Sequence, residues 1–301
     1  MIDDRTMTAN SRRTRLLWII LVVALIGGGV SVSEVNRSTT VRSGDLDALS
    51  SRLRARVVYE RPDGIYAQDI AGRARLIGAG GTWPRWSPDG STVAFVKENS
   101  IAIVNVDGTG LAAVARASAP RAVAWHQDGE RIFFTDGDSV RAVRISSGEV
   151  SQVASGARFL EIDISRDGRY LAATVKGFGG FGFRVRIYDL KTGNSRELAK
   201  GCGASYSPDG QQVSNLLSGH RKIALLDLNK GSEEGAVYAP TGYRFDNPFW
   251  SNHPDWIVSQ SDGKKSDILL HRVSDGASWQ ITFTGDTNRA DLFVYSSSGS
   301  G

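Results

Sequence analysis

The pentapeptide WSPDG at Trp86–Gly90 returns along the chain at regular intervals and decides the fold. It recurs as WHQDG at Trp125–Gly129, ISRDG at Ile164–Gly168 and YSPDG at Tyr206–Gly210, and a degenerate copy, WSNHPDW, begins at Trp250. The first residues of successive copies are 39, 39, 42 and 44 positions apart. A period of about 40 residues, with a bulky apolar residue, a tight turn and a following apolar strand, is typical of a four-stranded β-propeller blade.

Each element of the repeat has a mechanical role in such a blade. The bulky residue ends the innermost strand and fills the gap between neighbouring blades, so we expect it in the core. The Asp-Gly pair supplies the positive φ of the hairpin between the first and second strands, and its single carboxylate is too few for a calcium loop. The predicted structural residues are Trp86, Asp89, Gly90, Trp125, Asp128, Gly129, Ile164, Asp167, Gly168, Tyr206, Asp209, Gly210 and Trp250.

The two ends of the repeat region each hold part of a blade. Residues 56–76 read as second, third and fourth strands, and 279–295 closes blade five and adds one lone strand, Ala290–Tyr295. Joining these pieces makes a sixth blade and leaves no open edge at the seam. The sequence therefore predicts an all-β fold: one six-bladed β-propeller over residues 56–295, closed by its N- and C-terminal strands, with 296–301 as a flexible tail.

The amino terminus carries the pattern of a signal-anchor. Residues 1–15 form a basic leader, and residues 16–32 form an apolar run that directly follows three arginines. As a helix this run spans about 25 Å, slightly less than a bilayer core. The positive-inside rule keeps the leader in the cytoplasm, so we expect a single-pass transmembrane helix in the bacterial inner membrane and a periplasmic propeller. Cleavage as a signal peptide, which would release the propeller into the periplasm, is the alternative.

Between the apolar run and the propeller, residues 33–55 are rich in Ser, Thr and Arg and read as a stalk. Within it, Asp45–Leu53 has leucines at helical spacing, which predicts about two helical turns.

Composition limits the possible function classes. The chain has 301 residues, 41% hydrophobic and 23% charged, as expected for a folded protein, and its 34 glycines fit a fold with many turns. A single cysteine, Cys202, excludes an intramolecular disulfide and a cysteine-based metal cluster. The net charge is +4, part of it in the leader, so the remainder is nearly balanced and argues against a nucleic-acid-binding surface.

A catalytic constellation does not emerge from the sequence. The four histidines, His126, His220, His253 and His271, are expected on different blades and faces, so they assemble neither a metal triad nor a Ser-His-Asp set. We therefore predict no catalytic residue, no metal and no cofactor. Cys202 reads as a small buried apolar residue rather than a reactive thiol.

The remaining candidates lie on the surface. Loops that enter the first strands converge on one face around the channel, and arginine recurs in five of the six. We expect a mildly basic, aromatic-edged funnel that binds a peptide or an anionic glycan; the alternative is that these arginines are merely solvated. The residues of this predicted mouth are Trp83, Arg85, Arg121, Arg158, Tyr243, Arg244, Asp246 and Arg289.

A second surface candidate is the loop KGFGGFGFR at Lys176–Arg184. Its glycines hold Phe178, Phe181 and Phe183 in a long turn. These phenylalanines either form a docking loop for a partner or fold back onto the blade.

The WSPDG and YSPDG anchors, the IYDL strand at Ile187–Leu190 and the repeat spacing resemble the TolB-like (WD-repeat-like) six-bladed propellers of bacterial envelope proteins. The resemblance covers Arg56–Tyr295 and implies a non-enzymatic protein-interaction scaffold with an envelope protein or peptide as partner. The member that gives the family its name has an α/β domain ahead of its propeller, for which a 23-residue stalk has no room, so that member's role is not carried over. A glycan or small-ligand binding propeller and a propeller enzyme of the lactonase or lyase type are the alternatives.

Overall fold

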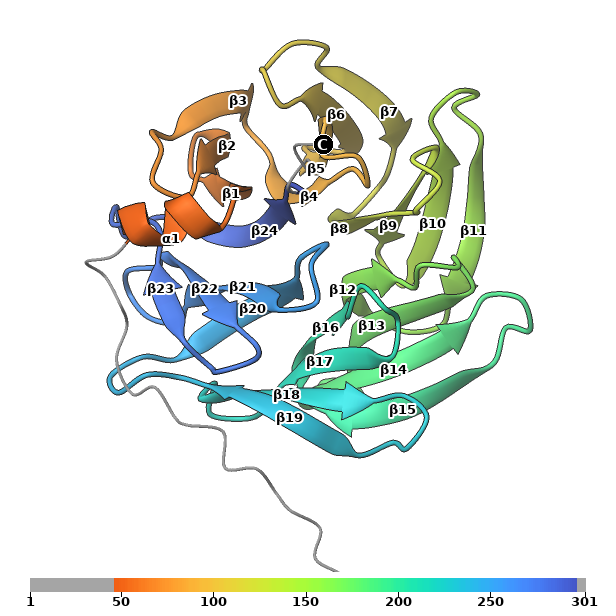
Figure 1. The fold of residues 1–301 in the computed structure, drawn as a ribbon. Coiled ribbons are helices and arrows are strands. Elements are labelled where there is room, and N and C mark those ends of the chain that lie inside the picture. The colour runs from red at the N-terminus through yellow and green to blue at the C-terminus, as the bar shows by residue number, and fades with distance from the viewer. Residues whose placement is uncertain (1–45, 297–301) are drawn as a thin grey trace, which may run out of the picture. The chain divides into compact units, whose positions relative to one another are not determined.

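Six four-stranded antiparallel sheets surround a central axis in the computed structural model, which describes residues 46–296 (Figure 1). This confirms the predicted all-β, six-bladed propeller. In each blade the first strand is the innermost, because the first strands contact one another around the ring. Five blades are continuous in sequence: β4 (Thr82–Trp86), β5 (Thr92–Lys97), β6 (Ser100–Asn105), β7 (Ala112–Arg116); β8 (Pro120–Trp125), β9 (Arg131–Asp136), β10 (Ser139–Arg144), β11 (Val150–Ser155); β12 (Phe159–Ile164), β13 (Tyr170–Lys176), β14 (Phe183–Asp189), β15 (Ser195–Lys200); β16 (Cys202–Tyr206), β17 (Gln212–Leu216), β18 (Lys222–Asp227), β19 (Glu233–Tyr238); β20 (Phe245–Trp250), β21 (Trp256–Ser261), β22 (Ile268–Arg272) and β23 (Ser278–Gln280).

The sixth blade joins the two ends of the propeller, as the sequence predicts. Its strands are β24 (Asn288–Val294), β1 (Ala55–Arg61), β2 (Gly64–Asp69) and β3 (Arg75–Ala79), in that order from the axis. Strand β24 pairs antiparallel with β1, from Ala55 opposite Val294 to Glu60 opposite Asn288, and Figure 1 shows the blue strand against the orange one. This pairing gives backbone hydrogen-bond partners to the strands at both ends of the propeller, so the seam of the ring has no unpaired strand edge.

The repeat motif occupies the places that a propeller requires. All five anchors are buried at the ends of innermost strands, and Trp86, for example, packs on Phe293 of the closing strand with ring centroids 6.0 Å apart. In the turn after β12, Gly168 has φ 69°, a left-handed conformation that favours glycine. There Asp167 accepts hydrogen bonds from the Ser165 hydroxyl (2.6 Å) and the Arg169 N–H (3.0 Å). The aspartates of the motif therefore hold turns.

Neighbouring blades are linked by hydrogen bonds beside the axis. The backbone N–H of Trp86 donates to the Asp291 carboxylate (2.8 Å), and the N–H of Tyr206 donates to the Asp163 carboxylate (2.8 Å). The N–H of Trp250 donates to the hydroxyl of Ser205 (3.0 Å). In each pair the acceptor residue comes directly before the anchor residue of the preceding blade, and in β24 the anchor position is Leu292. The same position of the repeat therefore links each of these blades to the next by a hydrogen bond.

Helix α1 (Leu46–Arg52) forms within the segment that the sequence marks as a stalk. Leu49 and Leu53 are buried in the same apolar cluster as Trp256 and Trp279, so this part of the segment packs on the propeller. The helix lies beside the turn between β20 and β21, on the face that carries the Asp-Gly turns. We call this the turn face, and the opposite face, where loops enter the innermost strands, the mouth face.

The predicted leader (1–15), the predicted transmembrane segment (16–32), the first part of the stalk and nearly all of the tail lie outside the described residues. Within residues 46–296, no helix has the length and apolar character needed to cross a bilayer.

Helix α1 offers a direct test of its packing. We expect Leu49→Ala to lower the free energy of unfolding by about 2–3 kcal/mol, because it removes a buried side chain from the cluster beside Trp256. The exposed neighbour Ser51 is the matched control, and Ser51→Ala is expected to change stability by less than about 0.5 kcal/mol. Urea denaturation of the full chain measures both. Equal stabilities of the two variants would contradict the packing of α1 on the propeller.

Candidate functional site

A repeated backbone distortion shapes the mouth face. Four of the six innermost strands have a left-handed residue three positions before the anchor position: Trp83 (φ 57°), Gly203 (φ 72°), Asn247 (φ 45°) and Arg289 (φ 47°). In β24 the anchor position is Leu292. The pairing register shifts at or beside all four of these residues, which marks a β-bulge in each strand. Non-glycine residues adopt positive φ at a cost, and such outliers concentrate at functional sites.

Two of these bulged residues meet at the seam of the ring. The Arg289 guanidinium lies 4.7 Å from the centroid of the Trp83 ring and forms an ion pair with Glu60 of β1. The other carboxylate oxygen of Glu60 accepts the backbone N–H of Trp83 (2.9 Å). Glu60 is buried, so one carboxylate holds both bulges in place. Arg121 of the next blade adds a second cation, 5.9 Å from the Trp83 ring.

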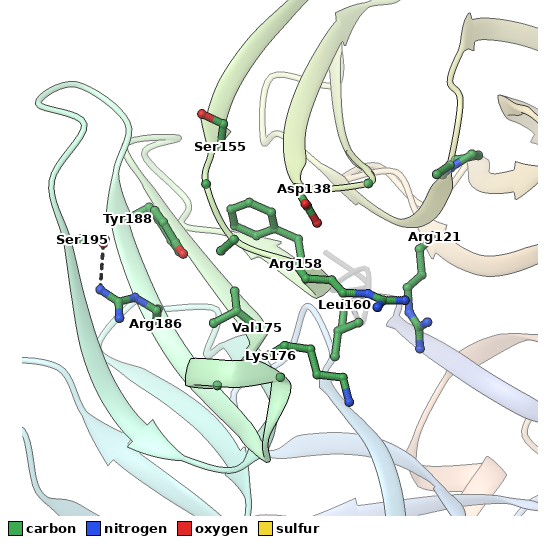
Figure 2. Close-up of a pocket in the computed structure, with 18 residues that line it drawn as sticks. Arg121, Asp138, Ser155, Arg158, Leu160, Val175, Lys176, Arg186, Tyr188 and Ser195 are labelled. Carbon is green, nitrogen blue, oxygen red and sulfur yellow. Dashed lines mark hydrogen bonds between the residues drawn. The ribbon is translucent and has the colours of Figure 1, made fainter.

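Positive charge gathers beside Trp83. Arg121 is the second residue of β8, Arg158 directly precedes β12 and Lys176 ends β13. Figure 2 shows Arg121 and Arg158 extending toward each other. Partial burial, together with the charges of Arg289 and Arg158, lowers the pKa of Arg121 below its ordinary value. Within the described part of the chain, Arg121, Arg158 and Lys176 form no ion pair with a carboxylate. We call Arg121, Arg158, Lys176 and Arg289 the basic cluster.

A large groove opens from the basic cluster between two blades. It lies on the mouth face between the blade of β8–β11 and the blade of β12–β15 and has a volume of about 1370 Å³. Arg121, Arg158 and Lys176 stand at one end, and Arg186, which donates to the Ser195 hydroxyl (3.0 Å), stands at the other (Figure 2). The repeat pattern carries no signal for this groove, because its walls come from different strands and loops.

The remaining mouth residues do not all join this cluster. Arg244 pairs with Asp262 (2.9 Å), and Tyr243 donates its hydroxyl to Gln280 (3.1 Å). Asp246 lies nearer the axis, where burial raises its pKa. Of the eight residues predicted at the mouth, the structure therefore brings Trp83, Arg85, Arg121, Arg158 and Arg289 together and turns Tyr243 and Arg244 toward their own neighbours.

The glycine-rich loop borders the groove. It contains the 3₁₀ turn η1 (Phe178–Gly180), and Gly177 and Gly180 line the groove wall. Phe181 is 82% exposed, and Phe183 is 38% exposed with the Lys176 ammonium 4.3 Å from its ring centroid. Phe181 thus projects from the blade instead of folding back onto it.

The channel itself is filled by a buried arginine. The Arg85 guanidinium lies 3.8 Å from the Phe249 ring centroid and is buried. On the mouth side of Arg85 a void of only about 10 Å³ remains, whereas a pocket of about 290 Å³ opens on the turn face. The predicted funnel at the mouth is therefore closed, and the open space on this face lies in the groove between blades.

Carboxyl groups surround Arg85: that of Asp291 is buried, and those of Asp163 and Glu161 belong to half-buried residues. Burial raises the pKa of Asp163 to about 6 and that of Asp291 to about 7, and it also raises the pKa of Glu161. Arg85 opposes each of these shifts through its charge. Of the acids near the axis, only Asp246 is predicted at the mouth from the sequence. Glu161, Asp163 and Asp291 are also on innermost strands, and the alternation of side chains along those strands is the signal that would find them.

The four histidines and Cys202 do not belong to the basic cluster. His271 is buried between the hydroxyls of Ser259 and Ser278, both 2.8 Å away, and burial lowers its pKa to about 3. Burial raises the pKa of Cys202, which disfavours its reactive thiolate. Among residues 46–296, no group of three or more His, Cys, Asp or Glu side chains is placed to hold a metal ion.

The fold defines the class of the described chain: a six-bladed β-propeller. In comparisons by sequence, no protein-family profile and no curated protein matches the chain. In structure, it is similar to TolB from Acinetobacter baumannii, with a TM-score of 0.65 and 18% identity over 80% of this chain and 66% of that one, which is just under two thirds of its length.

Two further structures have the same fold. A TolB-like protein from Agrobacterium tumefaciens aligns with a TM-score of 0.57 and 16% identity over 81% of this chain and 99% of that one. A chain of a nidogen/laminin complex aligns with a TM-score of 0.65 and 10% identity over 79% of this chain and 98% of that one. At these identities the similarity establishes the fold, and with it the resemblance to the TolB-like propellers.

The buried carboxyl group of Asp291 predicts a pH dependence. Its pKa of about 7 in the folded protein exceeds the ordinary 3.8, so the folded state keeps a proton that the unfolded chain releases. Its contribution to stability is present at low pH and is lost as pH rises from about 4 to about 7. Asp291→Asn keeps an oxygen for the Trp86 N–H but does not ionise. We expect the free energy of unfolding of the variant to fall less between pH 5 and pH 8 than that of the wild type, by about 1–3 kcal/mol.

The exposed residue Asp138 supplies the control for this measurement, and Asp138→Asn is expected to follow the wild-type pH profile. Parallel pH profiles of Asp291→Asn and the wild type, from urea denaturation, would refute the raised pKa.

Proposed function

We propose that this protein is a non-enzymatic protein-interaction scaffold of the bacterial envelope that binds an acidic partner through the mouth face. The observation that carries the proposal is the basic cluster, in which Arg121, Arg158 and Lys176 have no carboxylate partner within residues 46–296. Cations left without counter-charges at a rigid surface attract an acidic partner and steer its approach. The exposed Phe181 adds aromatic surface of the kind that is common at protein interfaces, whereas Trp83 is buried, with its ring 5.9 Å from the Arg121 guanidinium and 4.7 Å from that of Arg289.

The fold supports this reading at a coarse level. The similar structures include TolB and a chain from a nidogen/laminin complex, which is an assembly of two proteins. An anionic glycan could satisfy the same cations, whereas a metal-dependent propeller enzyme would need ligands where this face carries arginines and a lysine. The partner assay below separates the protein from the glycan.

Charge reversal tests the scaffold function. We expect Arg121→Glu/Arg158→Glu to remove the partners captured by crosslinking and pulldown from membranes, because the reversed cluster repels an acidic surface. Capture by the wild type should also weaken as salt rises. Mass spectrometry of the captured material distinguishes protein partners from glycan.

The matched control makes the same change of charge elsewhere. Arg73→Glu/Lys191→Glu alters two exposed side chains in turns between third and fourth strands, on the turn face. Its partner set should equal that of the wild type. If Arg121→Glu/Arg158→Glu also leaves every partner in place, the mouth face is not the interaction site.

The envelope location and the anchor are part of the same proposal. They rest on the sequence of residues 1–32, with its basic leader and apolar run. Within the described residues, the chain enters the propeller through α1, on the turn face.

Extraction of membranes tests the anchor. We expect the full-length protein to stay in the membrane pellet after washing with alkaline carbonate, because an uncleaved apolar helix is not released by disrupting charge interactions. Release into the supernatant, or an amino terminus beginning after residue 32, would show that the segment is a cleaved signal peptide.

A further inference from the structure

The groove between the blades of β8–β11 and β12–β15 has a composition that the basic cluster alone does not explain. Its floor is apolar: Phe159 and Val175 are 2% exposed and Leu160 is 7% exposed. Tyr188 packs on Phe159 with ring centroids 5.4 Å apart and completes the floor. A ligand that reaches this floor can bury an apolar side chain between the two blades.

Positive charge stands at both ends of the groove. Four cations line it, Arg121, Arg158 and Lys176 at the channel end and Arg186 at the outer end, against one carboxylate, Asp138. Arg186 is held by its hydrogen bond to Ser195, so its position is defined before a ligand binds. A ligand that contacts both ends must therefore carry several negative charges spread along its length.

The size and rim of the groove favour a chain rather than a small molecule. Its volume of about 1370 Å³ exceeds the roughly 300–1,000 Å³ of ordinary small-ligand pockets. Gly137 and Gly156 stand on the rim, and open space surrounds the position where a Cβ atom would lie at each. A rim without side chains lets another backbone approach closely.

From this juxtaposition we infer that the groove binds an extended, acidic segment of a protein partner, with one large apolar side chain seated on Phe159 and Tyr188. This rests on the proposed function and adds the form and chemistry of the partner. The negative charges of the segment pair with the cations at both ends, and the apolar side chain sets its register. The exposed Phe181 beside the groove provides further contact area for the same partner.

A model peptide tests the inference without knowledge of the natural partner. The probe is a fluorescein-labelled peptide, Glu-Asp-Glu-Phe-Glu-Asp-Glu, measured by fluorescence anisotropy with the full chain, next to the same peptide with serine in place of phenylalanine. We expect the phenylalanine peptide to bind about tenfold more tightly. A tryptophan that projects into the groove, Ala119→Trp, should reduce this difference while leaving the cations in place.

Matched variants keep the test decisive. Ala119 is an exposed residue of the groove wall, and Ala113→Trp on β7 places the same side chain on the surface outside the groove, where binding should be unchanged. Ser155→Trp, from the other wall, replaces Ala119→Trp if the latter lowers the unfolding midpoint.

The outcomes separate the two proposals. Equal binding of both peptides, lost in Arg121→Glu/Arg158→Glu but retained in Ala119→Trp, would overturn the groove inference and leave the acidic-partner function standing. No binding of either peptide to the wild type would overturn the groove inference. If charge reversal also leaves the captured partners unchanged, the proposed function fails as well.

Discussion

The pairing of β24 with β1 is the constraint on which the rest of this structure depends. It closes the ring, and it also assembles the site, because Arg289 comes from the carboxyl-terminal strand, Glu60 from the amino-terminal strand and Trp83 from the adjacent blade. The Glu60 carboxylate binds partners on both sides of the seam. Without closure these residues would lie at opposite ends of an open sheet array, so the stability of the ring and the geometry of the mouth face have one physical origin.

The acidic and the basic side chains of this propeller lie in separate regions. Beside the axis, the buried Asp291 and the half-buried Asp163 accept backbone N–H groups of the next blade and face Arg85, which is the one buried arginine among residues 46–296. The arginines of the mouth lie outside this ring of acids, and Arg121 and Arg158 carry no paired carboxylate in the described chain. A nearly balanced net charge is therefore compatible with a strongly basic surface.

Much of the architecture could be predicted from the sequence, because the same local pattern of strand, anchor and turn recurs in several blades. The anchors such as Trp86, the Asp-Gly turns and the two partial blades predict the number of blades and the closure. The arrangement of the residues at the mouth could be predicted only in part. Loop position indicates which residues approach the axis, but the direction of a side chain depends on the bulge at residues such as Trp83 and Arg289, which no pattern in a single sequence reveals.

The sequence by itself determined a closed six-bladed ring, since period, turn chemistry and anchor size act locally and identically in each blade. It also placed arginine on one face. Which arginines remain unpaired depends on tertiary contacts: Arg244 pairs with Asp262, whereas Arg121 lies beside the Trp83 ring. The closure of the channel by Arg85 and the groove between two blades likewise arise only when the blades pack together. The physical reason is that pairing and cavities arise from residues distant in the chain, and a repeat carries no information about how the side chains of different blades meet.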